Sequence, residues 1–436
     1  MIGEIRIRGN RKTRAYIIER ELTFKRGDTL RLDQLLQAFR LAREQLINIH
    51  LFNDAIVYVQ DFRGHTVDIA IDVKERWYLF PLPYVRPADR NLSVWSERDY
   101  SLSRLNYGMK LSWYNFTGRN DYLRAWFITG YSRQLEAAYD LPFFDRALKQ
   151  GLGMSVIYSE QKELNVLTAG NRQYFINSDT IPYSGKYLYE RMNLSLRYYY
   201  RPALHTRHFI RLSFNKVGID SAVTVWNPHY FQNANRTIFY PELSYTLNYS
   251  NADYIPYPLK GILLETGLTR KGVNADMNLW QLYARLTRSW PIAYKTYFNF
   301  WNWSMLKLPL DQPFYNQQFL GYGDLYMRGL DKYVVDGVAG SVIRNSFLRE
   351  LYSTSLPFTR IPSHDRIPIR IYARAFADCG YIYNRDFTAN SLTNRMLYTA
   401  GLGLDFVTFY DLTLKFDYSF NQLGQNGLFL HIRNDF

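Results

Sequence analysis

Apolar and polar residues alternate one by one along most of the chain after residue 76. In one clear example, the odd positions from 105 to 113 are all apolar, while the even positions between them hold Asn106, Gly108, Lys110 and Ser112. A period of two is that of a β-strand whose two faces meet different surroundings. Sixteen segments of this kind can be counted, at about residues 77–86, 104–116, 121–131, 133–143, 149–160, 187–200, 206–217, 237–250, 259–271, 278–289, 294–306, 341–354, 367–380, 395–406, 410–420 and 427–436.

The first 76 residues follow a different pattern, in which helical and strand periods are mixed. Apolar side chains at positions 35, 39, 42, 46 and 49 form one stripe of a helix. The expected elements are, in order, a strand at 4–8, a short helix between 13 and 27, a second helix at 32–49, and strands at 55–60 and 66–73. We therefore predict a small α/β domain of order βααββ over residues 1–76 and a second domain over residues 77–436.

The composition favours a membrane barrel for the second domain. Aromatic residues make up 17% of the chain, yet mean hydropathy is only −0.32 and no apolar run approaches the length that a membrane helix needs. Strands with an apolar face toward lipid and a polar face toward a wet lumen give this combination. The predicted fold is mainly β, a 16-stranded transmembrane antiparallel β-barrel after one small α/β domain.

The lengths of the connections support the same fold. If the small domain is periplasmic, most connections on its side of the barrel are short, and most long ones lie on the opposite side, as in outer-membrane barrels. A middle-length link after the twelfth strand, through Pro357 and Pro362, is the main exception. An even number of strands closes a barrel without a free edge.

The charge distribution and the absence of known motifs argue against several other classes of protein. The net charge is +14, and residues 1–76 contribute 14 basic and 11 acidic residues. The basic residues are spread along alternating strands, which favours a charged lumen or contact with anionic lipid over nucleic acid.

The chain has one cysteine, Cys379, which allows no internal disulfide or cysteine metal site. Without a nucleotide-binding or hydrolase motif, we expect no enzymatic activity, cofactor or metal. No signal peptide is visible, so we expect the export signal, and further N-terminal domains, to lie outside this sequence.

The longest connection in the second half of the chain runs from about residue 307 to residue 340. It holds five glycines, and its single arginine, Arg328, lies between Met327 and Gly329. Long connections without periodicity are usually functional or disordered. A surface loop whose glycines only form turns is the simpler interpretation.

The small domain, the sixteen strands and the Arg-Gly motif in the sixth extracellular loop together resemble the BamA/TamA-type outer-membrane assembly superfamily. The small domain resembles a POTRA (polypeptide-transport-associated) domain, which the family places in the periplasm. In this family the sixth loop folds into the lumen, and its arginine pairs with acids on the twelfth and thirteenth strands. The residues that match this lumenal lock are Met327, Arg328, Gly329, Leu330, Glu350, Asp378 and Gly380, with Leu330 in place of the family's usual aromatic residue.

The resemblance also implies a weak seam between the first and last strands, where a client strand can add. Pro81 and Pro83 lie in the first strand and cannot donate to a β-ladder. An unpaired linker into the barrel would explain these two prolines equally well. Ile432 and the terminal Phe436 lie on one face of the last strand, and a terminal aromatic residue is typical of the signal by which such barrels are recognised.

The leading functional hypothesis is an assembly factor that folds and inserts client proteins in a bacterial outer membrane. Its expected partners are unfolded outer-membrane client polypeptides, periplasmic or lipoprotein accessory subunits, and outer-membrane lipid, with no nucleic acid. The alternatives are a polypeptide secretion pore of the two-partner type, a pore or binding barrel without assembly activity, and the barrel portion of a larger chain that carries an enzyme.

Overall fold

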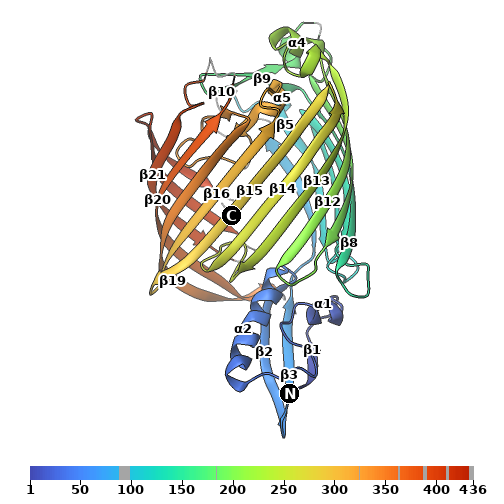
Figure 1. Cartoon of the computed structure of the whole chain (residues 1–436), viewed down its shortest axis with the longest axis vertical. Helices are drawn as coiled ribbons and strands as arrows, with labels where there is room; N and C mark the ends of the chain where they lie inside the picture. The colour runs from blue at the N-terminus through green and yellow to red at the C-terminus, as the bar shows by residue number, and fades with distance from the viewer. Residues whose placement is uncertain are drawn as a thin grey trace.

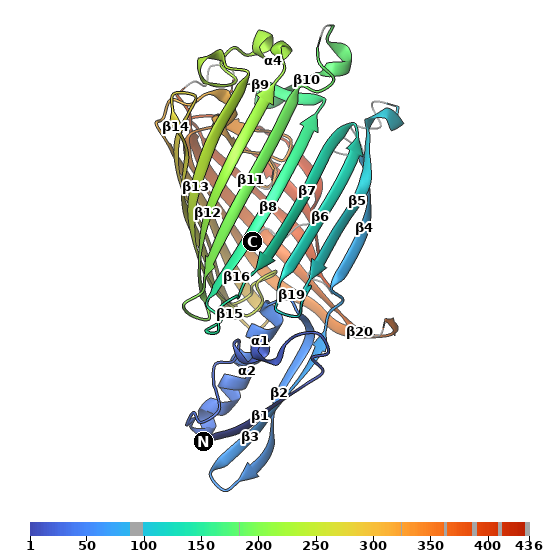
Figure 2. The same cartoon turned by 90° about the vertical axis from the view of Figure 1, so that its right-hand side faces the viewer.

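The chain forms a β-barrel with a small domain attached to one end, as the computed structural model shows (Figure 1). The structure describes residues 1–87, 99–182, 184–323, 325–361, 364–385, 390–408 and 412–431, without the side chains of residues 357–366. The N-terminus lies in the small domain, at the end of the molecule opposite α4 (Ser221–Trp226) and the hairpin of β9 (Glu163–Ala169) and β10 (Arg172–Asn177) (Figures 1 and 2).

The small domain has the predicted order of elements. They are β1 (Ile2–Arg8), α1 (Ala15–Glu19), α2 (Leu32–Asn48), β2 (Phe52–Arg63) and β3 (Thr66–Glu75). The sheet order is β1-β3-β2, with β3 parallel to β1 and antiparallel to β2. The apolar stripe of α2 packs on this sheet, because Leu35, Phe39, Ala42 and Leu46 are buried in one cluster with Ile69 and Ile71.

The barrel is a single antiparallel sheet of sixteen strands, which confirms the predicted fold class. In chain order they are β4 (Leu79–Pro87), β5 (Leu105–Tyr114), β6 (Tyr122–Gly130), β7 (Ser132–Leu141), β8 (Gln150–Gln161), β11 (Tyr189–Tyr200), β12 (Thr206–Ile219), β13 (Thr237–Ala252), β14 (Gly261–Asn274), β15 (Met277–Ala293), β16 (Thr296–Leu308), β19 (Ala339–Ile361), β20 (His364–Tyr383), β21 (Met396–Val407), β22 (Thr413–Asn421) and β23 (Asn426–His431).

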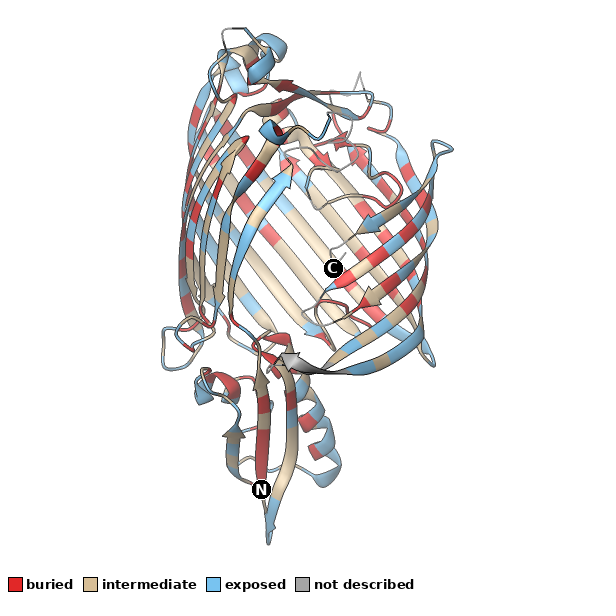
Figure 3. Cartoon of the chain, turned by 180° about the vertical axis from the view of Figure 1, so that it is seen from behind, coloured by how far each residue is buried: buried red, intermediate tan, exposed pale blue. Residues whose placement is uncertain are grey.

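Burial alternates along these strands (Figure 3). On β22 the inward residues Thr413, Lys415 and Asp417 are buried, whereas the outward residues Phe416 and Tyr418 are exposed. Apolar side chains that face outward from a barrel sheet have lipid as their natural surroundings.

In the part of the chain that the structure describes, no helix has the length and apolar character needed to cross a membrane.

The link after the twelfth strand differs from the prediction. β19 and β20 continue as a paired hairpin as far as Ile361 and His364, so strand pairing covers most of the predicted link, while Pro362 lies outside the described residues. Pro357 pairs with Arg366 in this extension. A proline is tolerated here because β16, the other neighbour of β19, pairs with it only as far as Arg349.

The connections at the end of the barrel opposite the small domain contain structure that the strand pattern does not reveal. Their elements are η1 (Leu102–Arg104), β9 (Glu163–Ala169), β10 (Arg172–Asn177), η2 (Ser178–Thr180), α4 (Ser221–Trp226), η3 (Gln232–Ala234), α5 (Phe314–Gln317), β17 (Gln318–Leu320) and β18 (Val335–Asp336). Side chains from several of these connections, among them Val166, Val223, Tyr230 and Phe314, share one hydrophobic cluster. This cluster fixes the connections to one another above the barrel.

The small domain is held to the barrel by buried polar contacts. Glu21, just after α1, accepts two hydrogen bonds of 2.5 and 2.7 Å from Arg201 in the β11–β12 connection, and both side chains are buried. Burial, together with the nearby Arg201, lowers the pKa of the Arg20 guanidinium to about 10, so this group remains charged at neutral pH. The guanidinium also donates to the Leu148 carbonyl at 2.6 Å. These contacts fix the small domain at the mouth of the barrel.

Candidate functional site in the barrel lumen

The connection between β16 and β19, residues 309–338, folds into the barrel and is called loop six below. Two of its apolar side chains, Met327 and Leu330, are almost completely buried. They pack in a cluster with Trp301 of β16, Val342 of β19 and Leu397 of β21, which lie on the barrel wall. An ordinary surface loop would leave such side chains in water, so the simpler interpretation of this connection is wrong.

Arg328 lies at the centre of the contacts between loop six and the wall. Its Nε donates to Asp378 Oδ2 at 2.8 Å, and its Nη2 donates to the other carboxylate oxygen, which makes the pair bidentate. Its Nη1 donates to Ser346 Oγ at 2.9 Å, and the guanidinium lies 4.1 Å from the centre of the Phe376 ring. Arg328 is 2% exposed. A buried arginine with this number of donors satisfied holds its loop in one place.

Gly329 allows loop six to approach the wall closely. Its φ of +83° lies in the left-handed region, and a Cβ atom at this position would be 3.0 Å from Cβ of Ser419 on β22. Its carbonyl accepts from Asn421 Nδ2 at 2.8 Å. The glycine after the arginine therefore lets the loop backbone bind directly to β22.

Glu350 does not take the role that the family resemblance implied. Arg328 is bonded to Asp378 on β20 and to Ser346 and the Asn345 carbonyl on β19, whereas Glu350 pairs with Lys295 at 3.0 Å. The register between β19 and β20 shifts between Glu350 and Tyr352, near the end of the β16 pairing. Glu350 therefore lies beside the β15–β16 turn, away from loop six.

Gly380 has the position expected of it, on the same face of β20 as Asp378. A Cβ atom there would be 3.0 Å from the Ser341 carbonyl oxygen of β19. Its role in this structure is close packing between two wall strands, without a described contact to loop six.

Two further basic residues fix loop six, and sequence reasoning missed both. Lys307, at the end of β16, is buried and donates to the carbonyls of Asn316 and Gln318, each at 2.7 Å. Arg344 of β19 donates to the Tyr326 carbonyl, and its guanidinium lies between the rings of Trp301 and Tyr326 at 4.3 and 4.5 Å. No clear signal pointed to them, because both faces of β16 and β19 mix apolar and polar residues.

A second ion cluster lies farther along the same wall. Arg374 of β20 contacts Asp405 of β21 at 3.0 Å and Asp417 of β22 at 2.6 Å, and all three side chains are buried. His431 of β23 lies 3.8 Å from Asp417 and 3.5 Å from Asp331 of loop six. This cluster joins the last four strands of the barrel to one another and to loop six.

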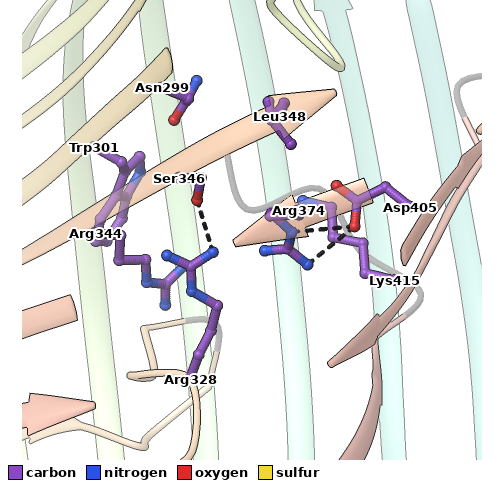
Figure 4. A pocket seen from close by; sticks show the side chains of 9 residues that line it. All are labelled: Asn299, Trp301, Arg328, Arg344, Ser346, Leu348, Arg374, Asp405 and Lys415. Carbon is purple, nitrogen blue, oxygen red and sulfur yellow. Dashed lines mark hydrogen bonds and ion pairs between the residues drawn. The ribbon is translucent and has the colours of Figure 1, made fainter. Parts of the chain in front are cut away.

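A small cavity separates the two clusters (Figure 4). In this view Arg328 is directed toward Ser346, while Arg374, Asp405 and Lys415 form a separate group. The lining residues are Asn299, Trp301, Arg328, Arg344, Ser346, Leu348, Arg374, Asp405 and Lys415. Among the residues that the structure describes, no group of three or more His, Cys, Asp or Glu side chains is placed to hold a metal ion.

The structure describes part of the predicted seam between the first and last barrel strands, β4 and β23. Pro81 and Pro83 pair with Leu111 and Met109 in the β4–β5 ladder, so this segment is a strand and not an unpaired linker. β4 and β23 are the two ends of the sixteen-stranded sheet, and no backbone pair joins them within the described residues. Ile432 and Phe436 lie outside the described residues.

The comparisons with known proteins agree with this architecture. Residues 1–76 match the POTRA family model, described as a surface antigen variable number repeat. BamA from Haemophilus ducreyi, crystallised without POTRA domains 1–3, is 16% identical with a TM-score of 0.53, and the match covers 98% of this chain and 83% of BamA. No curated protein matches the chain in sequence.

Two CdiB structures resemble this chain to a similar degree as BamA does. CdiB from Escherichia coli is 14% identical with a TM-score of 0.56, over 98% of this chain and 75% of CdiB. CdiB from Acinetobacter baumannii is 14% identical with a TM-score of 0.51, over 98% of this chain and 72% of CdiB. These structural matches establish a shared fold that extends across both domains. Identities this low establish no more than the fold.

Proposed function

Because the chain combines a POTRA domain with the barrel fold of BamA and CdiB, which supports its assignment to the BamA/TamA-type superfamily, we propose that it is an outer-membrane β-barrel assembly factor. It folds client proteins and inserts them into the outer membrane, with its POTRA domain in the periplasm. Its partners are unfolded client polypeptides, outer-membrane lipid, and accessory subunits that meet the POTRA domain at a sheet edge.

The observation that carries this proposal is the chemistry of the free edge of β4. The Tyr114 N–H donates to the Tyr78 carbonyl at 2.8 Å, so the even-numbered residues of this strand face β5. In an antiparallel strand, the odd-numbered residues then direct their backbone groups to the opposite edge. Three of those residues are Pro81, Pro83 and Pro87, which have no N–H.

A strand edge that lacks donors pairs weakly with β23. It still offers all of its carbonyls, so a client strand can add there and be released again. The lumenal ion clusters have a structural role in this mechanism. They hold β20 to β23 in place from the inside while the edge between β4 and β23 stays weak. The work of insertion comes from the folding free energy of the client, since we expect no nucleotide hydrolysis.

The test is the insertion of an unfolded client barrel into liposomes that contain this protein. We expect faster insertion than into protein-free liposomes and than into liposomes that carry a porin of similar size. An insertion rate equal to that of both controls contradicts the proposal.

A polypeptide secretion pore is the second candidate, because this fold suits it equally well. It needs loop six to leave the lumen, where Arg328 now occupies the interior. Planar-bilayer conductance separates the two candidates. The assembly factor gives small, flickering currents, whereas a pore gives large and steady ones. Steady conductance without client insertion would indicate a barrel that only conducts.

A further inference from the structure

The short connection between β13 and β14, residues 253–260, links the POTRA domain to the far wall of the barrel. The side chain of Asn48, at the end of α2, binds both sides of this turn. Asn48 Nδ2 donates to the Ala252 carbonyl at 3.1 Å, and the Ile255 N–H donates to Asn48 Oδ1 at 3.1 Å. Asn48 is buried. The POTRA domain thus holds the turn by two hydrogen bonds from one side chain.

The same turn places one side chain inside the lumen. Tyr257 is 2% exposed, and its hydroxyl donates to Asp405 Oδ2 at 2.8 Å. Its ring lies 5.1 Å from that of Tyr372 on β20. Four strands separate β14 from β21 in the sheet, so this contact crosses the barrel and does not follow the wall.

Asp405 is also the partner of Arg374, which in turn contacts Asp417 on β22. One carboxylate therefore accepts from Tyr257 on one oxygen and from Arg374 on the other. The turn reaches the second ion cluster from the POTRA side, whereas loop six reaches it through Asp331 and His431.

We propose that residues 253–260 form a strut by which the POTRA domain holds the last strands of the barrel, with Asn48 as its anchor and Tyr257 as its contact. When α2 moves away from the barrel mouth, the turn loses Asn48, Tyr257 withdraws from Asp405, and β20 to β22 loosen next to the weak edge of β23. A client bound to the POTRA domain can then relax the seam strands from a distance. Only this last consequence rests on the proposed function.

The test needs no client, so its failure is distinguishable from failure of the proposed function. A single-cysteine protein is made with Cys379→Ala and Thr413→Cys. Thr413 is an inward and buried residue of β22, near Lys415. The rate at which a maleimide labels Cys at position 413 in liposomes then reports how firmly β22 is held.

Tyr257→Phe removes only the hydroxyl, and we expect labelling to become about tenfold faster, since the lost hydrogen bond is to a charged group. Asn48→Ala should give an increase in the same direction. If Asn48 acts through Tyr257, the double variant labels no faster than Tyr257→Phe alone. Unchanged labelling in Tyr257→Phe overturns the proposal.

Thr13→Val is the matched control. Thr13 is another buried polar residue of the POTRA domain, and its hydroxyl accepts from Asn115 of the β5–β6 turn at 2.9 Å. This contact has no connection to Asp405, so labelling should not change. If Thr13→Val accelerates labelling as much as Asn48→Ala does, the effect is a general loosening of the domain, and the strut is refuted.

Discussion

Two parts of the barrel wall are both buried and polar on the inside, but they are held in different ways. On the wall formed by β8, β11 and β12, neutral side chains bond to the neighbouring strand, as Ser155 does to Ser195 at 2.7 Å and Asn193 to Asn215 at 2.8 Å. On the wall formed by β20 to β22, the buried groups include the ions Arg374, Asp378, Asp405, Lys415 and Asp417. Their partners include Arg328 of loop six and Tyr257 of the β13–β14 turn.

The two walls differ in which elements provide the partners of their inward polar side chains. In the first wall these two neutral contacts join residues that are directly paired in the sheet, so they need no connection that enters the lumen. The second wall depends on two connections that enter from opposite mouths of the barrel. A wall that is held by removable elements can be loosened, and this is the wall that ends at β23.

Breaking the Arg328–Asp378 pair should have the largest effect. Removing one partner of a buried ion pair costs about 3–5 kcal/mol, because the remaining charge is left buried. We expect Arg328→Glu and Asp378→Arg each to lower the temperature at which the barrel loses its fast gel migration, and the double variant to recover part of the loss. Equal loss in the double variant would show that the pair itself is not responsible.

Glu350→Gln is the matched control for this experiment. It changes an acid that the family resemblance placed in the same cluster, but Glu350 pairs with the partly exposed Lys295. Exposed pairs contribute about 0–1 kcal/mol, so migration should hardly change.

A smaller effect is expected from the approach of loop six to β22. Gly329→Ala adds a Cβ atom 3.0 Å from Ser419 at a positive φ, whereas Gly323→Ala has a similar φ of +75° and nothing within 4 Å. Both variants carry backbone strain, and only the first carries the clash, which costs about 1–3 kcal/mol. Protease protection of loop six should therefore fall further in Gly329→Ala. Equal protection in the two variants would place the loop away from the wall.

The smallest effect is expected on the other wall. Ser155→Ala removes one neutral hydrogen bond, worth about 1 kcal/mol, and touches no loop. Barrel stability should fall slightly, and protease protection of loop six should stay as in the parent protein. A loss of loop protection here would mean that the two walls are not independent.

The sequence predicted the elements that depend on local pattern. Alternation placed most of the strand ends within two or three residues, for example 294–306 against Thr296–Leu308 for β16. Parity also placed Asp378 and Arg374 on the inward face of β20. These predictions succeed because a strand exposes its face pattern directly in the order of its residues.

Contacts between distant segments were harder to predict. Glu350 was misplaced because only the family resemblance pointed to it, and the register of β19 and β20 shifts at that point. Tyr257 gave no signal, since a tyrosine in a short turn is ordinary and its partner Asp405 is 148 positions away. The β9–β10 hairpin was missed because it lies within a long connection outside the barrel sheet.

The most direct test of the weak seam restores its missing donors. Pro81→Val with Pro83→Val adds two N–H groups to the free edge of β4, and Leu82→Val, whose backbone faces β5, serves as the control. At about 1 kcal/mol for each added hydrogen bond, the account predicts client insertion slower by about thirtyfold, together with a more heat-resistant barrel. A barrel that becomes more heat-resistant yet inserts clients at the parent rate would contradict it.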